Sequence, residues 1–353
     1  MSYQLNQKLS ALSPYIPVEE NREIIHLDAN ESFLNLPETV LKETKKALGE
    51  ISFNRYPDPF ASELCKAFGS FYGVNPNHVT AGNGSDELIS VLLSAFLMKG
   101  ETMVTTDPDF SMYTFYPHLT ESNCVLLEKP EEGTMRVDDL IRTIKENNAR
   151  LLLFSNPCNP TGLGLSKEDV HRLITSVDAL IVLDEAYMDF WGREQSFLGK
   201  EDQYDNLIIL RTCSKMGFAA ARLGFAVANQ KITGLIRAVK SPYNVNVMTQ
   251  RAGTIFLNHP DLVKENIQKV VESRNCLEKA LQALKKKYPE KFFMEESVTN
   301  FLYLRLENAK EIYESLLQKG ISVRYFPQAL RVTAGSPTEN EKFLEAFEAL
   351  LED

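Results

Sequence analysis

The sequence predicts an α/β protein with a mostly parallel central sheet, helices on both faces and a smaller α+β domain beside it. Short apolar runs that resemble strands alternate with helical patterns, which is typical of parallel strands joined by crossover helices. The runs are almost continuously apolar, as expected for strands that are covered on both faces. After about Lys240 the pattern changes to long charged amphipathic helices and strands with clearer alternation, which indicates a second domain.

The elements of the large domain follow from these runs in order. Helical patterns occupy Ala61–Tyr72 and Asp86–Met98, and Ser166 with Asp169 predicts the capped start of another helix. We expect strands at Val79–Ala81, Thr102–Thr105, Cys124–Leu127, Leu151–Phe154, Leu180–Leu183, Leu207–Leu210 and Gly224–Ala228.

The smaller domain begins with long, charged, amphipathic helix patterns that run from Gln250 to Lys287. Its expected strands are Asn300–Leu306, Ile321–Tyr325 and Leu330–Thr333. The final helix has Ser336 as its N-cap, Pro337 at its first position and Glu339 to complete a capping box. We therefore expect a large domain at residues 30–245 and a small domain made of residues 1–29 and 246–353.

Composition excludes several classes of protein. The 353 residues carry a net charge of −10 and show no basic face, which argues against a nucleic-acid partner. Five cysteines at spacings that suit no metal, and scattered histidines, indicate reduced thiols and no metal site. Met1–Ser13 lacks an apolar signal core and Leu88–Met98 is too short to cross a bilayer, so we expect a cytoplasmic protein without a membrane partner.

Four groups of residues follow strand ends, where open parallel sheets bind ligands. The first is Ala81–Glu87 (AGNGSDE), between a strand and a helix. Glycines allow close backbone approach and a helix N-terminus offers free N–H groups, which suits a phosphate. An ordinary glycine-rich turn explains the segment equally well. Its spacing matches neither a Walker loop nor GxGxxG.

The second group is Ser155–Gly162 (SNPCNPTG). Two Asn-Pro pairs make a rigid turn, because each proline fixes its own φ and restrains the preceding residue. Such a turn can aim the amide of Asn159 at a phenolate oxygen of a ligand. A plain turn is the alternative, which the doubled pattern makes less attractive.

The third group is Leu183–Tyr187 (LDEAY), where an apolar strand ends in acid. A buried carboxylate needs a cationic partner, and a protonated pyridine nitrogen is one. Asp184 would keep that nitrogen protonated and make the ring an electron sink, and Tyr187 would donate to the ring oxygen. A magnesium-binding acid, as in a Walker B strand, is the alternative, although the chain has no P-loop.

The fourth group surrounds Lys215, the sole lysine between Lys200 and Lys231. Most lone lysines are solvated surface charges. Because Thr212, Ser214 and Arg222 flank it, Lys215 is better explained as an amine that forms a Schiff base with an aldehyde cofactor. The hydroxyls and Arg222 would hold the phosphate of that cofactor. Together the four groups predict a pyridoxal-phosphate enzyme.

In their order, these motifs resemble the aspartate-aminotransferase-like family, which has the type I fold of pyridoxal-phosphate-dependent transferases. The resemblance covers nearly the whole chain. Within the family the chain is similar to the histidinol-phosphate aminotransferase branch. The segments that carry this likeness are Leu27–Glu31 (LDANE), Asn54–Pro59 (NRYPDP), Ser241–Asn246 (SPYNVN), Gly320–Arg324 (GISVR) and Leu330–Gly335 (LRVTAG).

The resemblance implies roles for the matching residues. Lys215 would move the proton between the substrate Cα and the cofactor C4′, Asp184 would pair with the pyridine nitrogen, and Tyr187 completes the catalytic set. Phe110 would stack on the ring, and Asn159 and Tyr187 would bond its hydroxyl oxygen. The residues implied at the phosphate end are Gly84, Ser85, Asp86, Thr212, Ser214 and Arg222. Tyr56 would reach the phosphate from the other subunit, so a homodimer is expected.

The same resemblance implies a substrate site made of Arg331, Arg324, Tyr243 and Asn30. Arg331 would receive the α-carboxylate of glutamate and, in the other half-reaction, face the phosphate of histidinol phosphate, with Arg324 and Tyr243 as helpers. Salt bridges inside the small domain are the alternative for both arginines. The partners expected are thus a small-molecule amino donor and a 2-oxo acid.

The reaction expected from the resemblance is transfer of the amino group of L-histidinol phosphate to 2-oxoglutarate, giving imidazole-acetol phosphate and L-glutamate. An aromatic amino-acid aminotransferase or a threonine-phosphate decarboxylase-like enzyme uses the same cofactor chemistry and is the alternative. A nucleotide-binding dehydrogenase, or a regulator that has lost catalysis, would leave Lys215 without a role.

Overall fold

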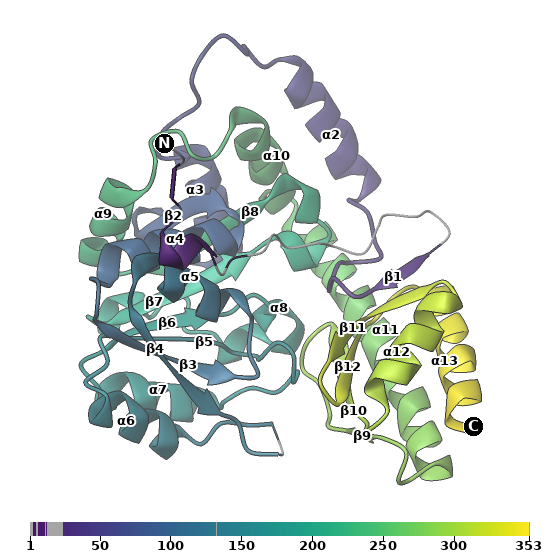
Figure 1. Cartoon of the computed structure of the whole chain (residues 1–353). Helices are drawn as coiled ribbons and strands as arrows, with labels where there is room; N and C mark the ends of the chain where they lie inside the picture. The colour runs from purple at the N-terminus through teal and green to yellow at the C-terminus, as the bar shows by residue number, and fades with distance from the viewer. Residues whose placement is uncertain (1–2, 5, 11, 13–23, 132, 353) are drawn as a thin grey trace.

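The computed structural model describes residues 3–4, 6–10, 12, 24–131 and 133–352. A seven-stranded sheet in the order β2-β8-β7-β6-β5-β3-β4 forms its larger part (Figure 1). The antiparallel strand β8 lies between β2 and β7, and the other neighbouring pairs are parallel. The strands are β2 (Val79–Asn83), β3 (Thr102–Asp107), β4 (Asn123–Glu128), β5 (Leu151–Ser155), β6 (Leu180–Asp184), β7 (Leu207–Thr212) and β8 (Leu223–Ala228). The prediction of seven strands in a mostly parallel sheet is confirmed.

Both faces of this sheet are buried, which explains the continuous apolar runs. In β7, Leu207 and Ile209 belong to one core while Ile208 and Leu210 belong to the other, as the two-residue period of a strand requires. The first core contains residues of α3 (Ser62–Tyr72), α6 (Val137–Glu146) and α7 (Lys167–Ser176). The second contains residues of α4 (Gly84–Phe96), α5 (Met112–Thr120) and α9 (Gln230–Val239).

Short helices complete the larger part of the molecule. The remaining α-helices there are α1 (Gln7–Ser10), α2 (Glu38–Gly49), α8 (Met188–Trp191) and α10 (Val247–Leu257). The 3₁₀ helices are η1 (Pro76–His78), η2 (Arg193–Gln195), η3 (Glu201–Gln203), η4 (Ser214–Met216) and η5 (Ala219–Ala221). Within the described ranges, every helix is too short or too polar to span a lipid bilayer.

A second, five-stranded sheet has the order β1-β11-β12-β10-β9 and lies beside the first (Figure 1). Its strands are β1 (Ile25–Leu27), β9 (Phe293–Met294), β10 (Phe301–Arg305), β11 (Ile321–Phe326) and β12 (Ala329–Thr333). The helices α12 (Ala309–Gln318) and α13 (Pro337–Glu352) contribute to its separate core. Strand β1 pairs with β11 in parallel, so the end of the N-terminal arm joins this sheet.

The helical patterns over Gln250–Lys287 form two helices in the structure. Helix α10 ends at Leu257, Asn258 and His259 form the break, and α11 (Pro260–Lys287) begins with a proline at its first position. Val263, Ile267 and Val270 of α11 lie in the core of the larger sheet. Its later residues Leu277 and Leu281 lie in the core of the smaller one. The domain boundaries at 30 and 245 stay a prediction, and residues 13–23 of the predicted arm lie outside the described residues.

Two helix starts match their sequence signals. The Ser166 hydroxyl accepts the N–H of Asp169 at the start of α7. At α13, Ser336 Oγ accepts the N–H of Glu339, and the Glu339 carboxylate accepts the N–H of Ser336 at 2.7 Å. The helix expected to open at Asp86 begins earlier, at Gly84, so that Gly84 and Ser85 supply free N–H groups.

Candidate active site

A pocket of about 250 Å³ lies beyond the carboxyl ends of the central strands. The predicted cofactor-binding residues other than Tyr56 all line it: Gly84, Ser85, Asp86, Phe110, Asn159, Asp184, Tyr187, Thr212, Ser214, Lys215 and Arg222. They come from segments spread over more than a hundred residues, and the sheet brings them together because its parallel strands end at one edge.

Lys215 lies in η4, directly after β7, and its amine faces this pocket. Its Nζ donates to the carbonyl oxygen of Ala29 at 3.2 Å and lies 5.8 Å from the centre of the Tyr187 ring. Burial, reinforced by the positive charges of Arg331 and Arg222, lowers the pKa of Lys215 to about 8. A lysine with this pKa supplies an uncharged, nucleophilic amine near neutral pH.

Asp184 is the last residue of β6 and is almost completely buried. Its carboxylate accepts the Tyr113 hydroxyl at 2.8 Å and the N–H of Ala186 at 3.0 Å. Burial raises the pKa of Asp184 to about 6, although these two hydrogen bonds act in the opposite direction. Sequence reasoning missed Tyr113; its position three residues after Phe110, at the start of a helix, was the available signal.

One corner of the pocket is shaped for an anion. Gly84 has a φ of +81°, and a Cβ there would lie 3.0 Å from Arg222 Nη2. A Cβ on Gly224 would lie 2.4 Å from the backbone nitrogen of Ser85. Glycine at both positions therefore lets the guanidinium and the N-terminus of α4 meet at one point. This combination of N–H donors, helix dipole and arginine fits the phosphate of pyridoxal phosphate.

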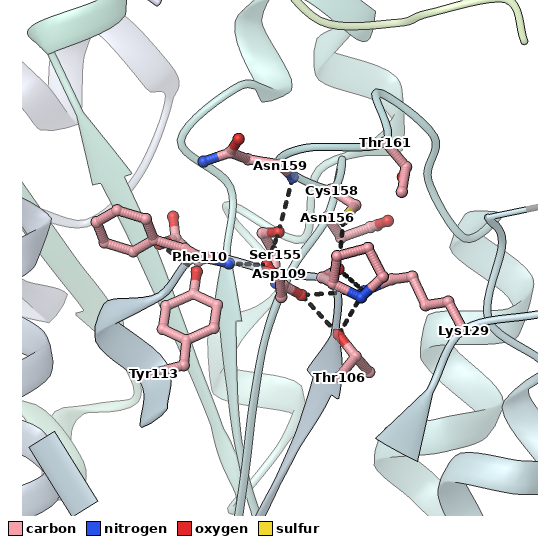
Figure 2. A network of polar contacts seen from close by, with 12 residues as sticks. Thr106, Asp109, Phe110, Tyr113, Lys129, Ser155, Asn156, Cys158, Asn159 and Thr161 are labelled. Carbon is pink, nitrogen blue, oxygen red and sulfur yellow. Dashed lines mark hydrogen bonds and ion pairs between the residues drawn. The ribbon is translucent and has the colours of Figure 1, made fainter. Parts of the chain in front are cut away.

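Arg331 on β12 connects the smaller sheet to the pocket. Its Nη1 donates to Asn159 Oδ1 at 2.5 Å, and its Nη2 donates to the carbonyl oxygen of Asp28. Because the Asn159 oxygen faces Arg331, its amide NH₂ points the other way, toward the side on which Phe110 lies (Figure 2). Asn159 is thus oriented as a donor in the pocket.

Asn30 and Tyr187 form a second link between the two sheets. Asn30 Nδ2 donates to the Tyr187 hydroxyl at 2.8 Å, and Asn30 N donates to Thr333 Oγ1 at 3.1 Å. Burial raises the pKa of Tyr187 to about 12, so the phenol keeps its proton. A protonated phenol beside the pocket can donate to a ring oxygen.

Five predicted residues lie outside the pocket lining. Two of them, Asn30 and Arg331, contact lining residues as described above, and the other three are Tyr56, Tyr243 and Arg324. Tyr56 is 81% exposed, and its ring stacks on that of Tyr243, with 4.7 Å between the centroids. Tyr243 therefore lies beside Tyr56 rather than beside the pocket of its own chain. Arg324 is exposed on β11, directly across the strand pair from Arg331. The lining also includes Glu31 and Ser155, neither of which was singled out from the sequence.

Across the ranges that the structure describes, no three His, Cys, Asp or Glu side chains are grouped to hold an ion.

The family model for aminotransferase class I and II matches residues 22–347. The histidinol-phosphate aminotransferase of Clostridium novyi is 42% identical over 322 residues, which cover 90% of this chain and 88% of that protein. The enzyme of the same name from Clostridium kluyveri is 36% identical over 353 residues, 98% of each chain. Among solved structures, histidinol-phosphate aminotransferase from Sinorhizobium meliloti in complex with pyridoxal-5′-phosphate has a TM-score of 0.88 at 22% identity, covering 99% of this chain and 98% of that one. The chain belongs to the aminotransferase class I and II family.

Proposed function

We propose that this chain is a pyridoxal-phosphate-dependent aminotransferase that converts L-histidinol phosphate and 2-oxoglutarate into imidazole-acetol phosphate and L-glutamate. The observation that carries the proposal is the Lys215 amine, with a pKa of about 8, facing a pocket that also holds Asp184 and an anion corner at Arg222. The substrate is supported by the name shared by relatives that are 36% and 42% identical.

The lining residues fit pyridoxal phosphate by their chemistry. Arg222 and the α4 N-terminus would hold its phosphate, with the hydroxyls of Thr212 and Ser214 beside them. Asp184 would accept the pyridine N–H, and Phe110 would cover the ring. When bound, this cofactor supplies an electron sink that weakens the bonds to the substrate Cα.

Lys215 would act both as the amine that holds the cofactor and as the base at the substrate Cα. With a pKa of about 8, roughly a quarter of the Lys215 side chains are uncharged at pH 7.5, against about one in a thousand for an ordinary lysine. The Arg331 charge that lowers this pKa also lies where an anionic substrate end would bind. Substrate binding and lysine basicity therefore depend on the same group.

In both half-reactions the substrate has an anionic group at one end and the amine that is transferred at the other. Arg331, held against Asn159, offers a guanidinium to the carboxylate of glutamate or the phosphate of histidinol phosphate. Arg324 lies opposite Arg331 on the neighbouring strand, so a doubly charged phosphate could contact both guanidinium groups. Asn30 would position Tyr187 next to them.

We further propose that the active form is a homodimer working in the cytoplasm. Phe53, Tyr56, Phe60, Tyr243 and Met248 are each more than 40% exposed, and a second copy would cover such apolar surface. Tyr56 would then reach the phosphate corner of the partner chain, with Tyr243 beside it. All five cysteines are free, which suits a reducing compartment.

Borohydride trapping tests the central claim. Reduction of the cofactor-loaded protein should fix the label on the peptide that contains Lys215, and Lys215→Ala should abolish both the label and turnover. A label on another lysine would reject the proposal.

Substrate choice is tested by comparing turnover of histidinol phosphate, phenylalanine and threonine phosphate. We expect the first to be preferred. Activity with phenylalanine or decarboxylation of threonine phosphate, without turnover of histidinol phosphate, would favour the alternative enzymes named above.

The dimer is tested with mixed subunits. Lys215→Ala chains and Tyr56→Ala chains are each expected to be impaired alone. A mixed dimer has one site in which both residues are intact, so mixing should restore part of the activity. No recovery in dimers shown to be mixed would count against a shared site.

A further inference from the structure

A buried ion pair lies directly behind the pocket and has no role in the chemistry proposed so far. The side chains of Asp109 and Lys129 are only 2% and 4% exposed, and Lys129 Nζ lies 3.4 Å from Asp109 Oδ2. Lys129 also donates to Thr106 Oγ1 and to the carbonyl oxygen of Pro108, each at 2.7 Å. Because Lys129 directly follows β4 and Thr106 belongs to β3, the pair joins the ends of two neighbouring strands.

Asp109 accepts hydrogen bonds from the other side as well. Its carboxylate accepts the Thr106 hydroxyl at 2.6 Å, the N–H of Phe110 at 2.8 Å and the N–H of Ser155 at 3.3 Å. The Ser155 hydroxyl donates a short hydrogen bond to Asp109 Oδ1, the oxygen that also accepts the N–H of Phe110. Together with Lys129, these donors fill the acceptor sites of an ionised carboxylate, which no neutral side chain of the same shape offers. Figure 2 shows Asp109 and Ser155 between Lys129 on one side and Phe110 and Tyr113 on the other.

The network reaches the pocket at two points. The Ser155 hydroxyl has one proton, which it gives to Asp109, so its lone pairs accept the N–H of Asn159 at 3.1 Å. The other point is the backbone N–H of Phe110. Phe110, Ser155 and Asn159 line the pocket, whereas Asp109 and Lys129 do not.

We propose that Asp109 and Lys129 are positioning residues of the active site, which hold Asn159 through the Ser155 hydroxyl and Phe110 through its backbone N–H. The inference rests on the proposed function, because Asn159 and Phe110 are the residues expected to touch the ring of pyridoxal phosphate. Asp109 would fix where the amide donor and the aromatic ring lie, and the Lys129 ammonium would supply the charged partner that a buried carboxylate requires.

Ser155→Ala is the first test, because it removes one link without leaving a buried charge unpaired. Its matched control is Ser196→Ala. Ser155 and Ser196 are both 5% exposed. Ser196 also donates to a buried carboxylate, that of Glu185, and accepts a backbone N–H, that of Leu198, but it lies outside the pocket.

The readout is the visible absorption of the cofactor-loaded proteins as a function of pH. An N–H donor beside the ring oxygen stabilises that oxygen as an anion and lowers the pH at which the bound cofactor loses its proton. Displacing Asn159 should therefore raise the midpoint by about one pH unit in Ser155→Ala and weaken cofactor binding about tenfold. Ser196→Ala should keep the wild-type midpoint and affinity, whatever its melting temperature.

Thr106 provides a test away from the pocket. Thr106→Val removes the hydroxyl between Lys129 and Asp109 and should raise the midpoint of the absorbance titration, by less than Ser155→Ala does. Thr106→Ser keeps a hydroxyl there and should have the wild-type midpoint. Asp109→Asn should give the largest shift; if that variant does not fold, the serine and threonine variants decide.

A wild-type midpoint in both Ser155→Ala and Thr106→Val would overturn the inference. Equal shifts in Ser155→Ala and Ser196→Ala would also overturn it, since they would indicate a general effect of lost stability. Failure of the wild-type protein to bind pyridoxal phosphate at Lys215 would instead reject the proposed function, so the two failures are distinguishable.

Discussion

At the scale of single residues, the arginine charges near the pocket have two effects. Arg331 and Arg222 make the pocket attractive to anions, and the same positive field, added to burial, lowers the pKa of Lys215. Asp184 stays largely ionised at neutral pH even though burial raises its pKa to about 6. Burying Lys215 and Asp184 costs free energy, and the same burial produces the pKa values that the proposed chemistry requires.

The lysine predicts a pH dependence for cofactor capture. The uncharged amine is the reactive form, so the rate at which the apoprotein takes up pyridoxal phosphate should rise with pH around a midpoint near 8. Stopped-flow absorbance between pH 6 and 10 measures this rate. In Arg331→Met the midpoint should move upward, because a neighbouring cation is lost. A wild-type midpoint near 10.5, the ordinary value for lysine, would contradict the assignment.

Tyr113 predicts a change in the acidic limb of activity. Its hydroxyl donates to Asp184 and lowers the pKa of that carboxyl, so Tyr113→Phe should raise this pKa above about 6. The acidic limb of kcat should then move to higher pH, measured between pH 5 and 8. Tyr204→Phe, which removes a hydroxyl that contacts His171 outside the pocket, serves as the control and should leave the limb in place.

At the scale of elements, helix ends contribute to the free energy of unfolding and have no part in the catalytic chemistry. Ser166 caps α7 by accepting the N–H of Asp169 at 3.1 Å. Ser166→Ala should lower the free energy of unfolding by about 1 kcal/mol, while Ser166→Thr retains most of it. Urea titration measures the difference, and kcat should stay the same in both variants. Equal losses in the alanine and threonine variants would show that the hydroxyl does not act as a cap.

The sequence was sufficient for the elements whose signals are local. Strands such as β7 were predicted because burial on both faces leaves a continuous apolar run. The sequence patterns over Gln250–Lys287 did not place the break at Asn258 and His259, because Pro260 begins a helix there without interrupting the amphipathic pattern. Lys215 and Asp184 stand out at strand ends, whereas the contacts of Tyr113 and Asp109 connect residues 71 and 46 positions apart and depend on how the strands are ordered.

At the scale of the whole molecule, burial of Asp184 opposes folding of the apoprotein at neutral pH. Its pKa is about 6 in the folded chain and 3.8 ordinarily, so the folded state disfavours ionisation. Below pH 3.8 both states are protonated and there is no cost. The cost grows as pH rises and is complete above about 6, where it reaches about 3 kcal/mol.

Asp184→Asn should therefore stabilise the apoprotein while it impairs catalysis. The gain in unfolding free energy should be near its maximum at pH 7.5 and about half as large at pH 5, as measured by urea titration of cofactor-free protein. An apoprotein variant that is no more stable than wild type at pH 7.5 would show that Asp184 is not desolvated.

Helix α11 belongs to both hydrophobic cores and couples their unfolding. Its 28 residues form a rod about 42 Å long, with Val263 and Val270 anchored under one sheet and Leu277 and Leu281 under the other. If either sheet unfolds, the other sheet loses part of the helix that packs against it. Calorimetry of the apoprotein should accordingly record a single heat-absorption peak rather than two. Two glycines placed at exposed positions 272 and 275 should soften the rod, broaden the peak and divide it, because glycine weakens a helix interior by about 1 kcal/mol per site.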